Sequence, residues 1–207
     1  EVKNLAGQHL NREYLFNSIK PFSNIFFASS ETIGHSLAAN FPAIDRVDVN
    51  KNFFGKELTI EINERKPAGI WCQGGGGCFY FDKEGVLFKA APRFSGQLFL
   101  VIEDGRGRDF GLTDVFDDRE LLEKINLAKN VLDGLKIVDY TNFFLPEGSF
   151  EFWLKTKEGW YIYLDKASDI PVQLVALKKF LEEKLPAGRR RTLEYVDLKI
   201  NNRIYYK

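Results

Sequence analysis

The stretch FPAIDRVDVNKNFFGKELTIEINERKPAGIW, from Phe41 to Trp71, decides how the chain is divided. Pro42 ends a helical pattern, because proline lacks the N–H that a helix interior needs. Alternating apolar residues then predict two strands, one in IDRVDV and one in KELTIEI, joined by the turn NKNFFG. A proline and a glycine follow directly after the second strand. We therefore expect two domains, 1–68 and 69–207.

The segments on either side of this stretch predict an α+β fold. Before it, we expect a strand at 1–7, a helix at 11–19 and a second helix within 29–42 that is capped by Ser30. The first unit would therefore be β-α-α-β-β. After it, we expect a mixed, mainly antiparallel β domain with two helices, DDRELLEKINLAKNVLDGL and SDIPVQLVALKKFLEEKL. Its expected strands are Gly69–Cys72, Cys78–Asp82, Val86–Lys89, Gln97–Glu103, Lys136–Phe144, Ser149–Thr156, Trp160–Asp165, RTLEYVDLKI and IYYK.

Composition and charge narrow the function classes. The 29 Lys and Arg residues balance the 29 Asp and Glu residues, so no net field attracts nucleic acid or anionic lipid. No apolar run reaches the roughly 18–20 residues that span a bilayer. The chain contains no methionine, and we interpret it as a fragment of a longer protein.

The only two cysteines, Cys72 and Cys78, bracket four glycines in IWCQGGGGCFYFD. A phosphate loop would open a helix, whereas the aromatic CFYFD that follows has strand character. The spacing is too wide for a CxxC redox motif. A hairpin with the cysteines opposite each other fits better, and a cross-strand disulfide is expected there in an oxidising compartment.

No other residues suggest catalysis or a metal site. His9 and His35 lie in unrelated segments, and no paired metal-ligand spacing accompanies the cysteines. No serine sits in a G-x-S-x-G elbow. Carboxylate pairs such as 117–118 and 182–183 are explained by helix capping or solvation, and the basic run at 189–191 is typical of a solvated loop. We expect no enzyme, no cofactor and no metal.

Three motifs, in order, resemble the FtsQ/DivIB family of bacterial cell-division proteins. The stretch from Phe41 to Trp71 is similar to the end of that family's POTRA domain. CFYFDKEGVLF with APRFSGQLFLVI resembles the hairpin and the next strand of its β domain, and EYVDLKINNRIYYK resembles its C-terminal strand and hairpin. The family's DLR is DLK here, and the cysteine-flanked glycines are not part of its general pattern. The resemblance covers nearly the whole chain, with the POTRA motif carried by Pro42, Glu64, Arg65 and Pro67.

This resemblance implies a non-enzymatic scaffold of the division machinery. It implies a single-pass protein of the cell membrane at the division septum, with its transmembrane helix before Glu1 and this chain on the extracytoplasmic side. The expected partners are FtsB/FtsL-type division proteins, with no nucleic acid among them. Their chain would be added as a strand to the edge strand EYVDLKI, where backbone groups give affinity and alternating side chains give specificity. The expected partner-binding residues are Tyr195, Asp197, Lys199, Ile200, Arg203 and Tyr205.

Alternation within EYVDLKI predicts that Val196, Leu198 and Ile200 face the core, with Tyr195, Asp197 and Lys199 outward. Two alternatives stay open. The segment could be only a well-packed terminal strand, and the chain could belong to a POTRA-containing translocation or outer-membrane assembly factor. An enzyme of unknown chemistry is a third, for which the sequence offers no positive sign.

Overall fold

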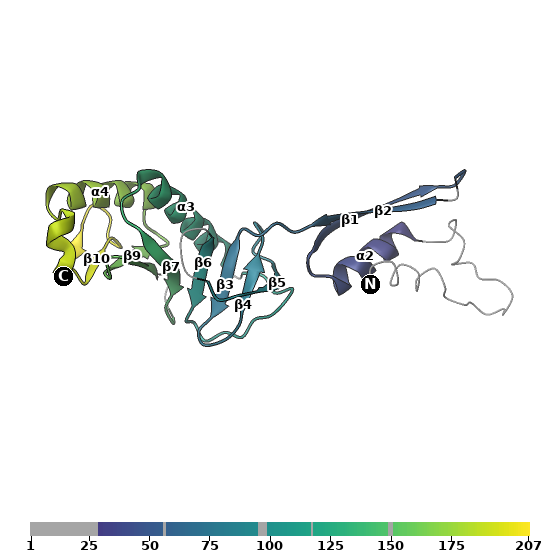
Figure 1. Cartoon of the computed structure of the whole chain (residues 1–207), viewed down its shortest axis with the longest axis horizontal. Helices are drawn as coiled ribbons and strands as arrows, with labels where there is room; N and C mark the ends of the chain where they lie inside the picture. The colour runs from purple at the N-terminus through teal and green to yellow at the C-terminus, as the bar shows by residue number, and fades with distance from the viewer. Residues whose placement is uncertain (1–28, 56, 95–98, 117, 149–150) are drawn as a thin grey trace. The chain divides into compact units, whose positions relative to one another are not determined.

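A computed structural model describes residues 29–55, 57–94, 99–116, 118–148 and 151–207. The chain separates into two compact units, Glu1–Lys66 and Pro67–Lys207. It is an α+β protein with one large mixed sheet and a few helices (Figure 1). The predicted first strand at 1–7, the predicted helix at 11–19 and His9 lie outside the described residues.

In its described part, the first unit contains a helix and a two-stranded antiparallel sheet. The helix is α2 (Ser30–Asn40), and the strands are β1 (Ile44–Asn52) and β2 (Glu57–Glu64). The predicted cap residue is wrong by one position, because Ser29 has the extended backbone of a cap and its side chain accepts from the N–H of Thr32 at 3.2 Å. Among the described residues of this unit, the buried core comprises Ile33, Leu37 and Ile44, with Phe41, Val47, Val49, Leu58 and Ile60 packed against it.

The second unit is built on a nine-stranded sheet of order β11-β10-β9-β8-β7-β6-β3-β4-β5. Five neighbouring pairs are antiparallel and three are parallel, namely β3–β6, β6–β7 and β9–β10. The strands are β3 (Gly69–Gln73), β4 (Cys78–Phe81), β5 (Leu87–Ala91), β6 (Leu100–Asp104), β7 (Tyr140–Leu145), β8 (Glu151–Thr156), β9 (Tyr161–Asp165), β10 (Tyr195–Asp197) and β11 (Tyr205–Tyr206).

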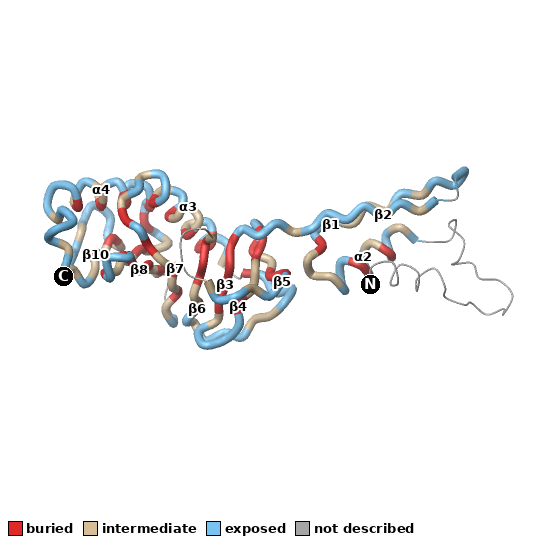
Figure 2. Tube along the Cα trace, viewed as in Figure 1, coloured by how far each residue is buried: buried red, intermediate tan, exposed pale blue. Residues whose placement is uncertain are grey.

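Two helices cover one face of this sheet, α3 (Arg119–Leu135) and α4 (Ile170–Glu183) (Figure 1). Asp118 and Asp169 cap them by accepting from backbone N–H groups of the first turn. Alternate residues of the strands meet the apolar stripes of the helices, so that the buried residues form a band along the sheet in Figure 2. This core includes Phe143, Phe152, Leu154, Ile162, Trp160 and Val196.

The structure corrects the ends of several predicted strands. The strand expected from Lys136 begins only at Tyr140, because Lys136 adopts a left-handed conformation with φ 49° at the end of α3. Of the strand expected at 97–103, positions 97 and 98 lie outside the described residues, and the described strand is Leu100–Asp104. The strand expected at 86–89 is Leu87–Ala91, since Val86 forms only an isolated bridge with Val115.

A buried ion pair lies beneath the helices. The indole N–H of Trp71 donates to Asp104 at 3.0 Å, and the guanidinium of Arg106 donates to both carboxylate oxygens of Asp104 at 2.9 and 2.7 Å. Burial alone would raise the pKa of Asp104, but the hydrogen bonds and charge of Arg106, together with the hydrogen bond from Trp71, outweigh that effect and leave the pKa below its ordinary value. This contact fixes the end of β6 against β3, its parallel neighbour.

Candidate functional site: the C-terminal edge of the sheet

The sheet edge expected at EYVDLKI lies one strand further out. Within that segment β10 comprises only Tyr195–Asp197, which pairs in parallel with β9 and antiparallel with β11. Both sides of β10 are therefore occupied, and the edge is β11 (Tyr205–Tyr206). A sequence pattern identifies a strand but carries no information on its neighbours, and the turn after β10 returns the chain along its outer side.

The inward position predicted for Ile200 is wrong. Val196 and Leu198 are buried, as the alternation predicts, whereas Ile200 is 52% exposed. The strand ends at Asp197, whose carboxylate accepts from the N–H of Lys199 at 2.9 Å and turns the backbone. The carbonyl of Ile200 then accepts from the buried side chain of Gln173 on α4 at 3.0 Å. The alternation is lost at this turn.

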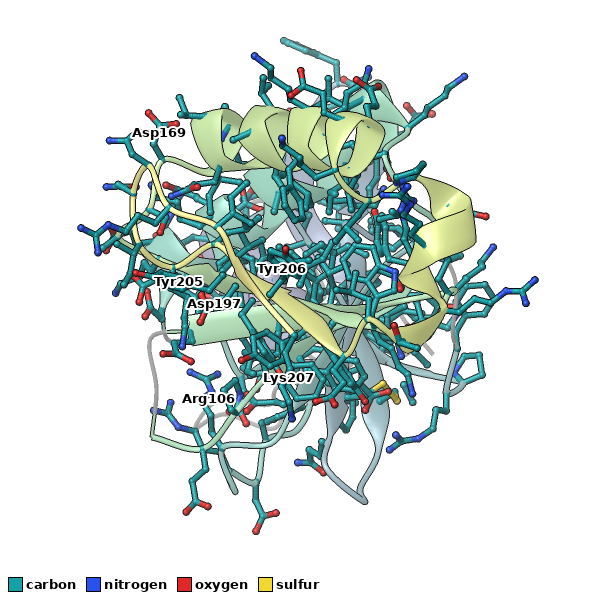
Figure 3. All side chains as sticks on the ribbon, turned by 90° about the vertical axis from the view of Figure 1, so that its left-hand side faces the viewer. Arg106, Asp169, Asp197, Tyr205, Tyr206 and Lys207 are labelled. Atoms are coloured by element: carbon teal, nitrogen blue, oxygen red, sulfur yellow. A yellow bond between two sulfur atoms is a disulfide. The ribbon has the colours of Figure 1, made fainter. Side chains whose placement is uncertain are left out.

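Among the described residues, no strand pairs with the outer side of β11. Lys207 and Tyr195 exchange backbone hydrogen bonds at 3.2 and 3.3 Å. Since hydrogen-bonding sides alternate along an antiparallel strand, the N–H and C=O of Tyr206 point away from β10. Tyr205 is 45% exposed and Tyr206 is 55% exposed, and Figure 3 shows both with Lys207 at this end of the second unit. The edge therefore offers one outward donor and one outward acceptor.

The predicted residues Arg203 and Tyr205 contact each other, and Tyr206 and Lys207, which were not predicted, hold this edge in place. The ring of Tyr206 lies 5.0 Å from Phe180 of α4, and the hydroxyl of Tyr205 accepts from Arg203 at 3.2 Å. The ammonium of Lys207 lies 3.0 Å from Glu194, which raises its pKa. These contacts connect the last strand both to the helix layer and to the segment before β10.

The side chain of Lys199 forms ion pairs within the second unit. Its ammonium lies 2.9 Å from Glu151 and 3.5 Å from Asp197, and the hydrogen bond to Glu151 is the main reason that its pKa is raised. It also lies 5.9 Å from the ring centroid of Tyr163. Asp197 therefore shares the Lys199 ammonium with Glu151 and also accepts the hydrogen bond that forms the turn. Neither the Asp197 carboxylate nor the Lys199 ammonium extends freely toward a partner.

The face of the sheet opposite the helices carries an aromatic row that the sequence analysis missed. It crosses four strands from β7 to β10, and each of its side chains is half-buried. Phe144 stacks on Trp153 at 4.4 Å between ring centroids, and Trp153 contacts Tyr161 edge-on at 5.1 Å. The aromatic row consists of Phe144, Trp153, Tyr161, Tyr163 and Tyr195.

This row continues to the candidate edge. Tyr163 lies parallel to Tyr161 at 6.3 Å and reaches Tyr195 of β10 at 5.4 Å. Burial, followed by the neighbouring phenols, raises the pKa of Tyr163, which keeps its hydroxyl protonated. The signal was present in FWL, YIYL and EYV, where aromatic residues occupy the positions that an ordinary half-solvated sheet gives to polar side chains.

The four residues of the POTRA-like motif have unequal roles. The Arg65 side chain donates to the carbonyl of Pro42 at 3.2 Å, and its guanidinium lies 3.5 Å from Asp45. Arg65 thus ties the end of β2 to the turn after α2. Glu64 is the exposed last residue of β2, and Pro67 is exposed in the following segment. The motif is brought together only in part, and its contacts are structural.

The predicted disulfide between Cys72 and Cys78 is present. The two residues face each other across the β3–β4 hairpin and are buried with Ile70 and Val101 on the face opposite the helices. The glycines form the turn and lead directly into β4 rather than into a helix. Arg93 donates to the carbonyls of Gln73 and Gly76 and braces that turn.

Within the described ranges, no helix is long and apolar enough to cross a membrane, and no group of three or more His, Cys, Asp or Glu side chains could hold a metal ion. Compared with known proteins, the chain matches no protein-family model and no curated protein. The candidate site therefore rests on the geometry of the sheet edge and the aromatic row.

Proposed function

We propose that this chain is a non-enzymatic scaffold that binds a partner protein by strand addition at β11. The observation that carries the proposal is the outward-facing backbone of Tyr206 beside the aromatic row. An edge strand with unpaired N–H and C=O groups is the physical basis of β-augmentation. Aromatic side chains next to it supply large contact areas at low entropic cost.

The sequence resemblance gives this scaffold its biological setting. The first unit is a POTRA domain and the second the β domain of an FtsQ/DivIB-like cell-division protein. The partners are FtsB/FtsL-type proteins, and the chain lies on the extracytoplasmic side of the cell membrane at the septum, held by a transmembrane segment upstream. The disulfide supports this setting, because disulfides persist outside the cytoplasm.

Replacing one backbone donor tests strand addition directly. Tyr206→Pro removes the outward N–H, while the ladder between β10 and β11 keeps its bonds through Tyr195 and Lys207. We expect binding of a peptide from the FtsB-like protein of the same organism to weaken by about tenfold or more, measured by calorimetry. Tyr206→Val, which retains the N–H, is the matched control for the lost ring contact with Phe180. Equal binding by Tyr206→Pro and Tyr206→Val would rule out β11 as the added-strand site.

The aromatic row is tested separately at Tyr195. Tyr195→Ala removes the contact with Tyr163 and should weaken binding of the same peptide by about 1–3 kcal/mol. A chain truncated before Thr192 lacks both β10 and β11 and should bind no peptide. Undiminished binding by a folded truncated chain would exclude the whole C-terminal edge.

A further inference from the structure

The charge of the second unit is uneven near the candidate edge. Residues 178–194, KKFLEEKLPAGRRRTLE, contain six lysines and arginines against three carboxylates, although the chain as a whole is neutral. This segment runs from the last turns of α4 through the short 3-10 helix η2 (Ala187–Thr192) to the residue before β10. An excess of one charge beside a binding edge attracts partners of the opposite charge.

Most acids of this region are already paired with other cations. Three ion pairs account for them: Lys179 with Glu183 at 3.9 Å, Lys207 with Glu194 at 3.0 Å, and Arg190 with Glu158 at 3.1 Å. Among the described residues, Lys184, Arg189 and Arg191 are exposed and form no ion pair. The remaining Glu182 is balanced in number by Lys178, which leaves three positive charges without a counter-charge. We call Lys184, Arg189 and Arg191 the basic cluster.

Backbone contacts place the basic cluster at one end of the β10–β11 ladder. The N–H of Glu194 donates to the carbonyl of Lys207 at 2.6 Å, so the residue before β10 lies beside the last residue of β11, which Figure 3 labels. Because the two strands are antiparallel, η2, which precedes β10, lies at the end of the ladder where β11 stops. On the helix side, Phe180 of α4 contacts the ring of Tyr206 at 5.0 Å. Both segments that carry the cluster therefore adjoin β11.

The three consecutive arginines of η2 have different roles. The guanidinium of Arg190 donates to the carbonyl of Leu185 at 2.6 Å and to Glu158 at 3.1 Å, which holds η2 against the end of α4. Arg189 and Arg191, on either side of this anchor, have exposed side chains. One arginine therefore fixes the backbone, and the other two extend into solvent from a fixed position.

We propose that the partner segment added at β11 carries carboxylates in the residues that pass beyond the end of β11, where the basic cluster binds them. This inference rests on the proposed strand addition and names the chemistry of its partner, a β-strand flanked on one side by an acidic stretch. Arginines suit this role because a guanidinium binds a carboxylate through two parallel hydrogen bonds. A protein segment is favoured over a lipid surface or a nucleic acid, because the excess charge is confined to one end of the strand ladder.

Charges at the rim of an interface act mainly on the rate of association and on its salt dependence. Exposed ion pairs add little to the equilibrium affinity, since water and salt screen them. The backbone hydrogen bonds of an added strand instead slow dissociation. The basic cluster and β11 should therefore be separable by kinetics.

The test measures association of the 207-residue chain with the peptide from the FtsB-like protein by stopped-flow fluorescence. For the parent, the association rate should fall by about tenfold between about 0.01 M and about 0.15 M salt, as the Debye length falls from roughly 30 to 8 Å. Arg189→Glu/Arg191→Glu should slow association by about tenfold at low salt and leave the dissociation rate within about twofold. Arg189→Gln/Arg191→Gln, which only neutralises the two charges, should slow it by about threefold.

A matched control lies at the opposite edge of the same sheet. Lys83→Glu/Lys89→Glu reverses two exposed lysines beside β5 and should change neither rate. If this control slows association as much as the arginine variants do, the effect comes from overall charge, and the proposal is wrong.

The peptide supplies the other half of the test. Replacing its Asp and Glu residues outside the added strand by Asn and Gln should slow association with the parent, and the arginine variants should then bind this neutral peptide as fast as the parent does. A natural peptide without carboxylates there, or an arginine variant that affects both peptides equally, overturns the proposal. Binding to phosphatidylglycerol vesicles that is lost in Arg189→Glu/Arg191→Glu, with an unchanged peptide rate, would assign the cluster to lipid instead.

Tyr206→Pro distinguishes failure of this inference from failure of strand addition. If Tyr206→Pro weakens the peptide complex and the arginine variants leave association unchanged, strand addition stands and the acidic flank is wrong. If Tyr206→Pro binds as tightly as Tyr206→Val, strand addition at β11 is wrong and the inference fails with it. A peptide that does not bind the parent overturns both.

Discussion

The two faces of the large sheet differ in what covers them. Under α3 and α4, strand residues such as Phe152 and Ile162 are fully buried in a continuous core. On the opposite face, the end at β3 and β4 holds the disulfide under Phe94 and Phe99, while the other end carries the half-buried aromatic row. Neighbouring residues of one strand therefore serve stability on one face and offer contact area on the other.

Phe152→Ala should have the largest effect, because it removes a fully buried ring from the helix-covered face. We expect the free energy of unfolding to fall by about 3–5 kcal/mol, measured by denaturant titration. A loss of unfolding free energy below about 1 kcal/mol would contradict the difference in stability that we assign to the two faces.

Asp104→Asn should also cost stability on the covered face, by about 3 kcal/mol, because it removes the charge that neutralises the largely buried Arg106. The lowered pKa of Asp104 predicts the pH dependence. The stability that its carboxylate contributes is present above the ordinary value of 3.8 and is lost as the pH falls through the lower folded value. Unfolding titrations from pH 2 to 6 should therefore show a steeper acid loss for the parent than for Asp104→Asn. Parallel curves would mean that another carboxylate controls the acid limb.

Removing the disulfide tests the β3–β4 end of the face opposite the helices, where Phe94 and Phe99 pack against it. Cys72→Ser/Cys78→Ser should lower the free energy of unfolding by about 2 kcal/mol, since the bridge closes a short loop with a sequence separation of 6. Chemical unfolding of the double variant and of the parent with and without reductant measures this. Reduction should destabilise the parent and leave the double variant unchanged.

Trp153→Ala should have the smallest effect on stability, about 1 kcal/mol, because its half-buried ring lies in the aromatic row and outside the core. If partner contacts extend along the aromatic row, the same variant should reduce the binding free energy of the FtsB-like peptide by more than it reduces the free energy of unfolding. Phe152→Ala, one residue earlier, is the control, because it should reduce the free energy of unfolding by more than it reduces the binding free energy of the peptide. A Trp153→Ala chain as unstable as Phe152→Ala would place the tryptophan among the core residues.

Several elements were predictable because their signals are local. The apolar spacing of residues 121–135 predicted α3, the cysteine spacing predicted a stapled hairpin, and alternation predicted the burial of Val196 and Leu198. The exposed position of Ile200 could not be predicted, because its carbonyl is held by Gln173, which is distant in the sequence. The start of β7 was missed because Lys136, a residue without the usual preference for a left-handed conformation, ends α3.

The α+β class, most of the elements and the pairing of the two cysteines could be predicted from the sequence alone. These follow from periodicity, turn chemistry and spacing, which act over a few residues. Tertiary contacts set which strand lies at the edge, make β10 parallel to β9, and bring five aromatic side chains from four strands into one row. The pairing of strands depends on how distant segments share a core, and a local pattern carries no record of that choice.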